Sequence, residues 1–163
     1  MHTIRKAVKE DLEAILQILN YEILHATAIY DYEEKSLADL QQWYADKVKK
    51  EIPLIVAEEA GEILGYATYD RFRPKEAYRK SVEHSVYLSQ KARGRGLGSI
   101  LLKEIIQRAR EQGHHSMIAG IDADNHVSIH LHSKTGFKEV GRMKEVGYKF
   151  DRWLDLVFMQ LIL

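Results

Sequence analysis

The chain has 163 residues, a length typical of one folded domain, because compact domains most often contain roughly 100–150 residues. Lys plus Arg and Asp plus Glu each total 24, so no net charge attracts nucleic acid or an anionic membrane. Cysteine is absent, which excludes disulfides, thiolate metal sites and a cysteine nucleophile. With neither a signal-peptide pattern nor an apolar run near the ~20 residues that span a bilayer, we expect a single cytoplasmic domain over residues 1–163, without nucleic-acid or membrane partners.

The first third of the chain predicts a strand and two helices. Residues 3–7 alternate like a strand, and the acids that follow suit the positive end of a helix running through Leu19. Ser36 is placed to cap a second helix that continues to Val48. The linker at residues 26–34 is aromatic rather than rich in Gly and Ser, which is typical of a loop that lines a site.

The remaining sequence alternates strand and helix patterns. We expect a hairpin from residues 53–57 and 63–69, strands at 81–88 and 116–121, helices at 99–112 and 126–135, and last strands at 137–142 and 153–161. These elements predict a mixed α/β (α+β) fold.

The segment Arg93-Gly94-Arg95-Gly96-Leu97-Gly98 joins a predicted strand to a predicted helix. Such a turn leaves backbone N–H groups pointing outward at the positive end of the helix dipole. Glycine permits positive φ and lets an anion approach the backbone, while Arg93 and Arg95 suit outlying phosphates. Two interpretations remain, an anion-binding cradle or a solvent-exposed helix entry.

Two other phosphate motifs fit the turn poorly. A P-loop ends in Gly-Lys-Ser/Thr, whereas Gly98 is followed by Ser99 and Ile100, which disfavours kinase or NTPase activity. The dinucleotide fingerprint needs a third glycine or alanine where Ser99 stands, and it needs an acid about 20 residues further on. A hydride-transfer enzyme is therefore a weak alternative.

The turn resembles the R/Q-x-x-G-x-G/A signature of the GNAT acetyltransferase superfamily, with Arg93, Gly96 and Gly98 in the signature positions. Asn125 through Gly136-Phe137 resembles its later N-x-x-S…G-F segment. The order of predicted elements is similar over nearly the whole chain, which implies a mostly antiparallel sheet of about seven strands flanked by about four helices.

A closer resemblance is to the phosphinothricin and methionine sulfoximine acetyltransferase branch. It rests on Glu83-His84-Ser85-Val86-Tyr87, on Asn125 with Ser128, and on residues 147–153 with Asp155. The resemblance implies acetyl-CoA as co-substrate, no metal, a small amino-acid-like amine as acceptor, and a homodimer to which the apolar C-terminal strand contributes.

The resemblance also implies which residues form the site. Contacts with acetyl-CoA are expected from Val86, Tyr87, Leu88, Arg93, Gly94, Arg95, Gly96, Leu97, Gly98, Ser99, Asn125 and Ser133. Contacts with the acceptor are expected from Arg73, Pro74, Lys75, Glu83, His84 and Ser85.

Glu83 is the candidate general base, because acetylation needs a neutral amine whereas a free amino acid is mostly ammonium near neutral pH. In a regular strand, Glu83, Ser85 and Tyr87 share one face. Backbone N–H groups of Val86 or Leu88 are candidates to bind the developing oxyanion. The alternative for Glu83 is an exposed or salt-bridged strand glutamate.

Arg73 precedes Pro74, which places its guanidinium in a loop, where it suits a carboxylate or phosphinate held bidentately. A solvated loop arginine is equally compatible with the sequence. The aromatic residues Tyr30, Tyr32, Phe72 and Tyr78 are candidates for the wall of the acceptor pocket, or for ordinary core packing.

His132 occupies the position where the superfamily often has a tyrosine that protonates the leaving thiolate. Either His132 or water supplies that proton. His126 and His130 have a spacing that can ligate zinc, but no third ligand is indicated, so no metal site is predicted.

Three functions fit these patterns to different degrees. The first is an N-acetyltransferase in which the amine attacks acetyl-CoA directly in a ternary complex. The second is an acyl-CoA-binding sensor without turnover. The third is an acetyltransferase for protein or polyamine amines.

Overall fold

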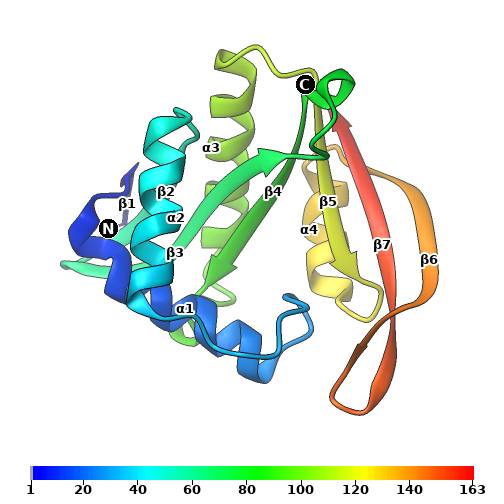
Figure 1. The fold of residues 1–163 in the computed structure, drawn as a ribbon, viewed down its shortest axis with the longest axis horizontal. Coiled ribbons are helices and arrows are strands. Elements are labelled where there is room, and N and C mark those ends of the chain that lie inside the picture. The colour runs from blue at the N-terminus through cyan, green and yellow to red at the C-terminus, as the bar shows by residue number, and fades with distance from the viewer. Residues whose placement is uncertain (1) are drawn as a thin grey trace.

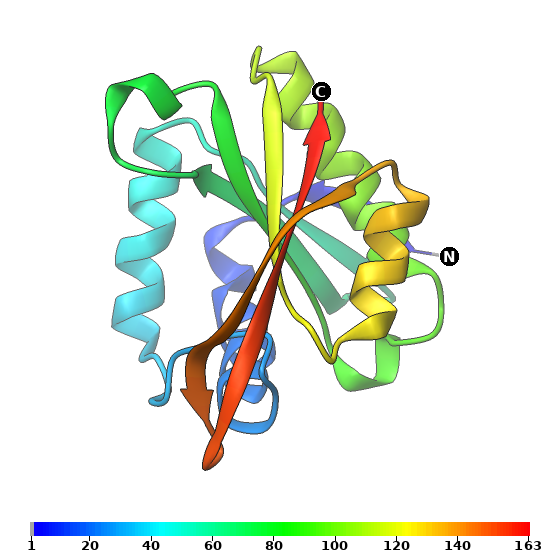
Figure 2. The ribbon, with the colours of Figure 1, turned by 90° about the vertical axis from the view of Figure 1, so that its right-hand side faces the viewer.

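The computed structural model describes residues 2–163, and within them seven strands form one sheet in the order β1-β2-β3-β4-β5-β7-β6, with four α-helices. The helices α1 and α2 cover one face of the sheet and α3 and α4 the other (Figures 1 and 2). All neighbouring strands are antiparallel except β4 and β5. The elements are β1 (Thr3–Lys6), α1 (Leu12–His25), α2 (Leu37–Lys49), β2 (Leu54–Glu59), β3 (Glu62–Arg71), β4 (Ser81–Leu88), α3 (Leu97–Glu111), β5 (Ser116–Asp122), α4 (His126–Lys134), β6 (Lys138–Lys149) and β7 (Arg152–Ile162).

The predicted fold class and the order of elements are confirmed, and local chemistry explains several boundaries. At the start of α2, Ser36 Oγ accepts a hydrogen bond from Asp39 N (3.1 Å), and the Asp39 carboxylate accepts one from Ser36 N (2.9 Å). This capping box satisfies N–H groups at the start of the helix that have no intrahelical acceptor. Substituting such a cap by alanine costs about 1 kcal/mol of stability.

One predicted boundary was wrong. The last but one strand was expected at residues 137–142, whereas β6 continues to Lys149. The pairing of β6 with β7 shifts register between Met143 and Gly147, where Glu145 adopts a left-handed φ of 50°. This irregularity breaks the alternating pattern. The longer hairpin projects beyond the rest of the sheet and reaches the loop after α1 (Figures 1 and 2).

Apolar clusters on both faces hold the central strands in place. On one face, Leu101, Leu102 and Ile105 of α3 are fully buried against the sheet. On the other face, α1 and α2 pack Ile15 and Leu40 against β2 and β3. Full burial of each such side chain contributes roughly 1.5–3 kcal/mol, so β3 and β4 are fixed from both sides.

Candidate active site

The glycine turn presents a row of unused backbone donors. Gly94 and Gly96 have left-handed φ angles of 74° and 79°, and α3 begins at Leu97. Within the described chain, no backbone N–H of residues 94–98 donates a hydrogen bond, whereas Ser99 N donates to Gly96 O (3.1 Å). An added methyl group at Gly94 or Gly96 would meet no protein atom within 4 Å, so the backbone angles, rather than packing, demand glycine. These N–H groups form a cradle for an anion at the N-terminus of α3.

The two arginines of the turn are ion-paired with protein carboxylates. Arg93 pairs with the buried Glu22 of α1, and Arg95 pairs with Glu59 at 2.6 Å. Burial raises the pKa of Glu22, although the charge of Arg93 opposes that rise. The Arg93 pair therefore braces the turn against α1, and the donors that remain for an anion are backbone groups.

Strands β4 and β5 diverge beside the cradle. They pair only along Ser81–Glu83 and Ser116–Ile118, and then separate (Figure 1). The N–H of Ser89 donates to β3 (2.9 Å), and the β3–β4 register is unbroken. Because N–H groups alternate in direction along a strand, those of Val86 and Leu88 point away from β3, into the gap that β5 has left. The gap thus offers unpaired backbone groups in line with the cradle.

Glu83 lies on the face of β4 that α1 and α2 cover. A methyl group added to Gly120 of β5 would lie 3.0 Å from Glu83 Oε1, and Arg73 approaches Glu83 Oε2 at 3.9 Å. Burial raises the pKa of Glu83, and the charge of Arg73 partly opposes this. A carboxylate with a raised pKa is a better proton acceptor near neutral pH.

The loop before β4 carries three further residues predicted to contact the acceptor, Arg73, Pro74 and Lys75, and all three are exposed. The Arg73 guanidinium lies 4.1 Å from the centre of the Phe72 ring, and Pro74 O accepts from Arg71 at 3.1 Å. Lys75 is exposed at the start of a 3-10 helix. Of this group, the structure brings Arg73 alone to Glu83.

A pair of histidines, the buried His132 of α4 and the partly buried His84 of β4, occupies the opposite face of β4. His132 Nδ1 lies 2.7 Å from the backbone carbonyl of Ser128, and its Nε2 lies 3.0 Å from Nε2 of His84. A carbonyl only accepts, so His132 carries its proton on Nδ1 and accepts from His84 Nε2–H. His84 Nδ1 is then a bare acceptor, buried and without a partner in the described chain.

This pair is uncharged at neutral pH. Burial, with His132 as the second cause, lowers the pKa of His84 to about 3, and burial also lowers the pKa of His132. In this tautomer His132 has no free N–H to offer a leaving thiolate. Its predicted role as a general acid would require both rings to exchange protons.

The two predicted cofactor residues on and before α4 differ in their surroundings. Asn125 caps α4, because its Oδ1 accepts from Ser128 N at 3.0 Å. That bond leaves the amide N–H groups of Asn125 for other partners. Ser133 is exposed on α4.

A cavity of about 630 Å³ lies on the Glu83 side of the sheet. Aromatic and acidic side chains both line it, and one of these acids, Asp70, is the cross-strand neighbour of Glu83 in the β3–β4 register. The loop at residues 26–34, predicted to line a site, contributes Ile29, Asp31, Glu33 and Glu34 to the lining of this cavity. The lining residues are Leu19, Ile29, Asp31, Glu33, Glu34, Lys35, Asp39, Leu40, Trp43, Tyr66, Thr68, Asp70, Ser85 and Tyr87.

The four aromatic residues predicted for the pocket wall are not among those lining residues. Phe72 instead packs edge-on against Tyr78 and Phe158. Tyr30 lies against Gly147, and the Tyr32 hydroxyl donates to Tyr148 O. These rings contact the hairpin and each other, which agrees with the alternative of ordinary packing, and the aromatic residues that line this cavity are Trp43, Tyr66 and Tyr87.

The sequence reasoning missed Asp122, at the end of β5. Its side chain is 4% exposed, Oδ1 accepts from Asp124 N at 2.8 Å, and Oδ2 has no partner in residues 2–163. Asp122 follows Gly120 by two residues, so both lie on the face that Glu83 occupies. An acid at the end of a buried strand is the sequence signal that could have pointed to it.

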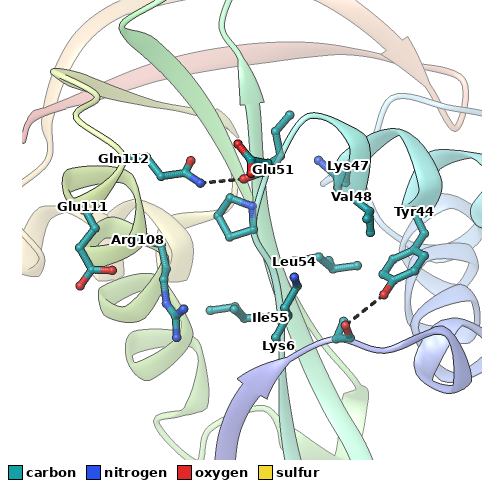
Figure 3. A pocket seen from close by; sticks show the side chains of 13 residues that line it. Lys6, Tyr44, Lys47, Val48, Glu51, Leu54, Ile55, Arg108, Glu111 and Gln112 are labelled. Carbon is teal, nitrogen blue, oxygen red and sulfur yellow. Dashed lines mark hydrogen bonds between the residues drawn. The ribbon is translucent and has the colours of Figure 1, made fainter.

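A second cavity, of about 420 Å³, lies between α2, the start of β2 and the end of α3 (Figure 3). The glycine turn is at the other end of α3, roughly 22 Å away at 1.5 Å per residue. The buried ammonium of Lys47 on its wall donates to Tyr69 O (3.0 Å) and Asp70 Oδ2 (2.9 Å). None of the predicted site residues lines this cavity.

Residues 2–163 contain neither a cluster suited to a metal ion nor a helix suited to a membrane. No cluster of three or more His, Cys, Asp or Glu side chains in residues 2–163 is arranged to hold a metal ion. None of the helices in the same range is long and apolar enough to cross a membrane.

Comparison with known proteins places this geometry in context. The family model "Acetyltransferase (GNAT) domain" matches residues 4–158. The chain is 48% identical, over 98% of its length and 93% of the relative's, to an L-methionine sulfoximine/L-methionine sulfone acetyltransferase of Pseudomonas aeruginosa. It is 36% identical to a phosphinothricin N-acetyltransferase of Alcaligenes faecalis, over 97% and 81% of the two chains. A phosphinothricin acetyltransferase of Sinorhizobium meliloti, solved in complex with acetyl-CoA, superposes with a TM-score of 0.96 at 40% identity, covering 99% of this chain and 88% of that one.

Proposed function

This chain belongs to the GNAT acetyltransferase family, and from that premise we propose that it transfers the acetyl group of acetyl-CoA to the amine of a small amino-acid-like substrate. Methionine sulfoximine, methionine sulfone and phosphinothricin are the acceptors named for its relatives. The observation that carries the proposal is the gap between β4 and β5. Unpaired backbone donors line it, the glycine cradle lies at one end, and Glu83 with Arg73 lies beside it.

The residues present suit acetyl-CoA. The free N–H groups of residues 94–98 are placed to bind the pyrophosphate, and the free backbone groups of Val86 and Leu88 suit the amide-bearing pantetheine arm. When bound, acetyl-CoA supplies a thioester carbonyl that a neutral amine can attack directly. The known structure of a relative with acetyl-CoA supports this assignment.

Glu83 prepares the amine. Its carboxylate accepts a proton from the acceptor's ammonium, directly or through water, and its raised pKa matches that task. Arg73, 3.9 Å from Glu83, is placed to bind the acceptor's carboxylate while Glu83 faces its nitrogen. A backbone N–H from Val86 or Leu88 donates to the carbonyl oxygen as negative charge develops there.

The leaving thiolate takes its proton from water in this account. The His84–His132 pair is neutral, and its N–H groups are committed to His132 Nε2 and Ser128 O. His84 therefore acts by holding His132 and the adjoining strand in place.

The test is release of free thiol from acetyl-CoA with a panel of amines. The panel holds methionine sulfoximine, methionine sulfone, phosphinothricin, common amino acids, polyamines and a lysine peptide. Turnover with the amino-acid-like amines, with the N-acetyl product identified by mass spectrometry, is the expected result. Tight binding of acetyl-CoA without turnover of any amine would replace the proposal with that of a sensor.

We further propose a homodimer. Large apolar side chains are exposed along β6 and β7, among them Val140, Met143, Trp153 and Ile162. Such a surface is typical of a protein interface. Light scattering on a sizing column is expected to give twice the 18.9 kDa chain mass. The cytoplasmic location stays a prediction from the sequence.

A further inference from the structure

Lys149, at the end of β6, is a buried lysine whose ammonium is fully used. The residue is 4% exposed, and Nζ donates to the carbonyl oxygens of Ile23 (2.6 Å), Ala26 (2.9 Å) and Ile29 (2.6 Å). An ammonium has three N–H donors, so each has an acceptor. Ile23 lies in the last turn of α1, where carbonyls lack intrahelical partners and positive charge is favoured. One cation thus joins the hairpin to α1 and to the residues that follow it.

The segment after α1, residues 26–36, depends on such contacts for its shape, because it contains no helix or strand. We call it the acceptor loop. At its far end, Asn20 Nδ2 donates to Lys35 O and Lys35 N donates to Asn20 Oδ1, both at 2.9 Å. In its middle, the Tyr32 hydroxyl donates to Tyr148 O. One side chain of the acceptor loop and one of α1 therefore assist Lys149.

A glycine of the hairpin fits the same loop closely. A methyl group added to Gly147 would lie 2.6 Å from the Tyr30 ring, too close for any side chain without displacing the ring. The ring and the hairpin backbone are therefore in direct contact, two residues from Lys149. The hairpin and the acceptor loop form one packed unit.

The acceptor loop is one wall of the cavity of about 630 Å³. Its residues Ile29, Asp31, Glu33 and Glu34 line that cavity, as does Ser85 of β4. The Ile29 carbonyl that accepts from Lys149 thus belongs to a lining residue. The glycine cradle is braced by the ion pair between Arg93 and Glu22, although the charge of Lys149 also acts on Glu22 and lowers its pKa.

We propose that Lys149 is a positioning residue for the acceptor amine: its main-chain hydrogen bonds, one to Ile23 of α1 and two to Ala26 and Ile29 of the acceptor loop, hold that loop at the cavity, whereas Lys149 makes no contact with the glycine turn in the part of the chain that the structure describes. This rests on the proposed function, because it takes the cavity as the acceptor site. Lys149, a residue of the C-terminal hairpin, would thus control the affinity for the acceptor.

The test compares Lys149→Met with Lys149→Arg and with Lys144→Met. Lys144 is an exposed lysine of the same strand without a hydrogen bond or ion pair in residues 2–163, so it is a matched control. Losing the donors is expected to raise KM for the acceptor by about tenfold or more, because one buried and two partly buried carbonyls lose their partner. The KM for acetyl-CoA should change by less than about twofold, since the ion pair between Arg93 and Glu22 remains when Lys149 is replaced. Arginine should restore part of the affinity, and Lys144→Met should leave both constants as in the wild type.

Hydrogen–deuterium exchange keeps the proposal separate from the proposed function and from simple unfolding. In Lys149→Met, amides of residues 26–36 should exchange faster while those of residues 94–99 keep the wild-type rate. If the variant does not fold, Tyr32→Phe, an exposed change that removes the bond to Tyr148, should raise the acceptor KM in the same direction by about twofold to fivefold. Unchanged exchange in residues 26–36, or an equal rise in both KM values, would overturn the role of Lys149. Absence of turnover in the wild type would instead overturn the proposed function. The exchange rates of residues 26–36 would then decide whether Lys149 holds the acceptor loop.

Discussion

The two sides of the candidate active site are built by different means. The proposed acetyl-CoA side consists mainly of backbone groups from one short stretch, residues 86–98, at the end of β4 and the start of α3. The proposed acceptor side consists of side chains from α1, the loop after it, α2, β3 and β4, and Lys149 of a hairpin more than 100 residues further along bonds to that loop. Backbone recognition depends on local conformation, whereas the acceptor side depends on tertiary contacts. The first should be common to acetyltransferases of this fold, and the second should set the choice of amine.

Glu83→Gln should have the largest effect. Glutamine keeps the size of the side chain but cannot take a proton, so turnover at pH 7 should fall by about 100-fold or more. Binding of acetyl-CoA, measured by calorimetry, should stay within about twofold, because Glu83 lies on the acceptor side. In the wild type, kcat/KM should rise with pH as Glu83 ionises, and this limb should be absent in the variant. Unchanged turnover across the pH range would remove Glu83 from the mechanism.

The same substitution should stabilise the fold at neutral pH. Burial raises the pKa of Glu83 above its unfolded value, so its ionised form is less favourable in the folded state. The stabilising contribution of the neutral form is complete below the unfolded pKa and is lost as pH rises through the folded pKa. Glu83→Gln should therefore raise Tm at pH 7 and leave it unchanged near pH 4. An equal Tm difference at both pH values would contradict this cause.

Gly96→Ala should have the next largest effect, which should fall on the binding of acetyl-CoA rather than on that of the acceptor. Gly96 has a φ of 79°, and an L-residue there is strained by roughly 1–2 kcal/mol, while its methyl group points to the open side of the cradle. The Kd for acetyl-CoA should rise by about tenfold. Gly141→Ala is the matched control, since a methyl group there also meets no atom within 4 Å and its φ is not left-handed. Equal effects of the two changes would argue against a backbone cradle.

Arg73→Met should act on the acceptor and on the pH profile together. Loss of the guanidinium should raise the acceptor KM by about fivefold to tenfold. Arg73 also lowers the pKa of Glu83, so its removal should move the rising limb of kcat/KM to higher pH. A rise in KM without a shift of the rising limb would show that Arg73 binds the acceptor but does not affect the pKa of Glu83.

His132→Phe should have the smallest effect. Since the His84–His132 pair is neutral and its protons are committed, removal of the His132 ring nitrogens should lower turnover by less than about threefold once the fold is intact. Circular dichroism and Tm establish that the variant is folded. A loss of turnover by about two orders of magnitude, together with loss of any decrease in rate at high pH that the wild type shows, would restore His132 as the general acid.

Sequence reasoning reached the parts of the molecule that depend on neighbours in the chain. Ser36 could be recognised as a helix cap, and Gly94 and Gly96 as conformational requirements, because each acts within a few residues. The alternation that places Glu83 and Ser85 on one face is likewise local.

The rest depends on partners distant in the sequence. Arg93 pairs with Glu22, 71 positions earlier, and Lys149 bonds to Ile23, 126 positions earlier. For neither residue does the sequence indicate which distant group is its partner. For the same reason the sequence could not decide between a pocket wall and ordinary packing for its aromatic residues, and it did not single out Trp43, Tyr66 and Tyr87, which line the cavity.

Steady-state kinetics with both substrates varied, on the wild type, Gly96→Ala and Lys149→Met, test the division between the two sides most directly. We expect Gly96→Ala to weaken the binding of acetyl-CoA alone and Lys149→Met to weaken the binding of the acceptor alone. Equal weakening of both substrates by each variant would contradict that division.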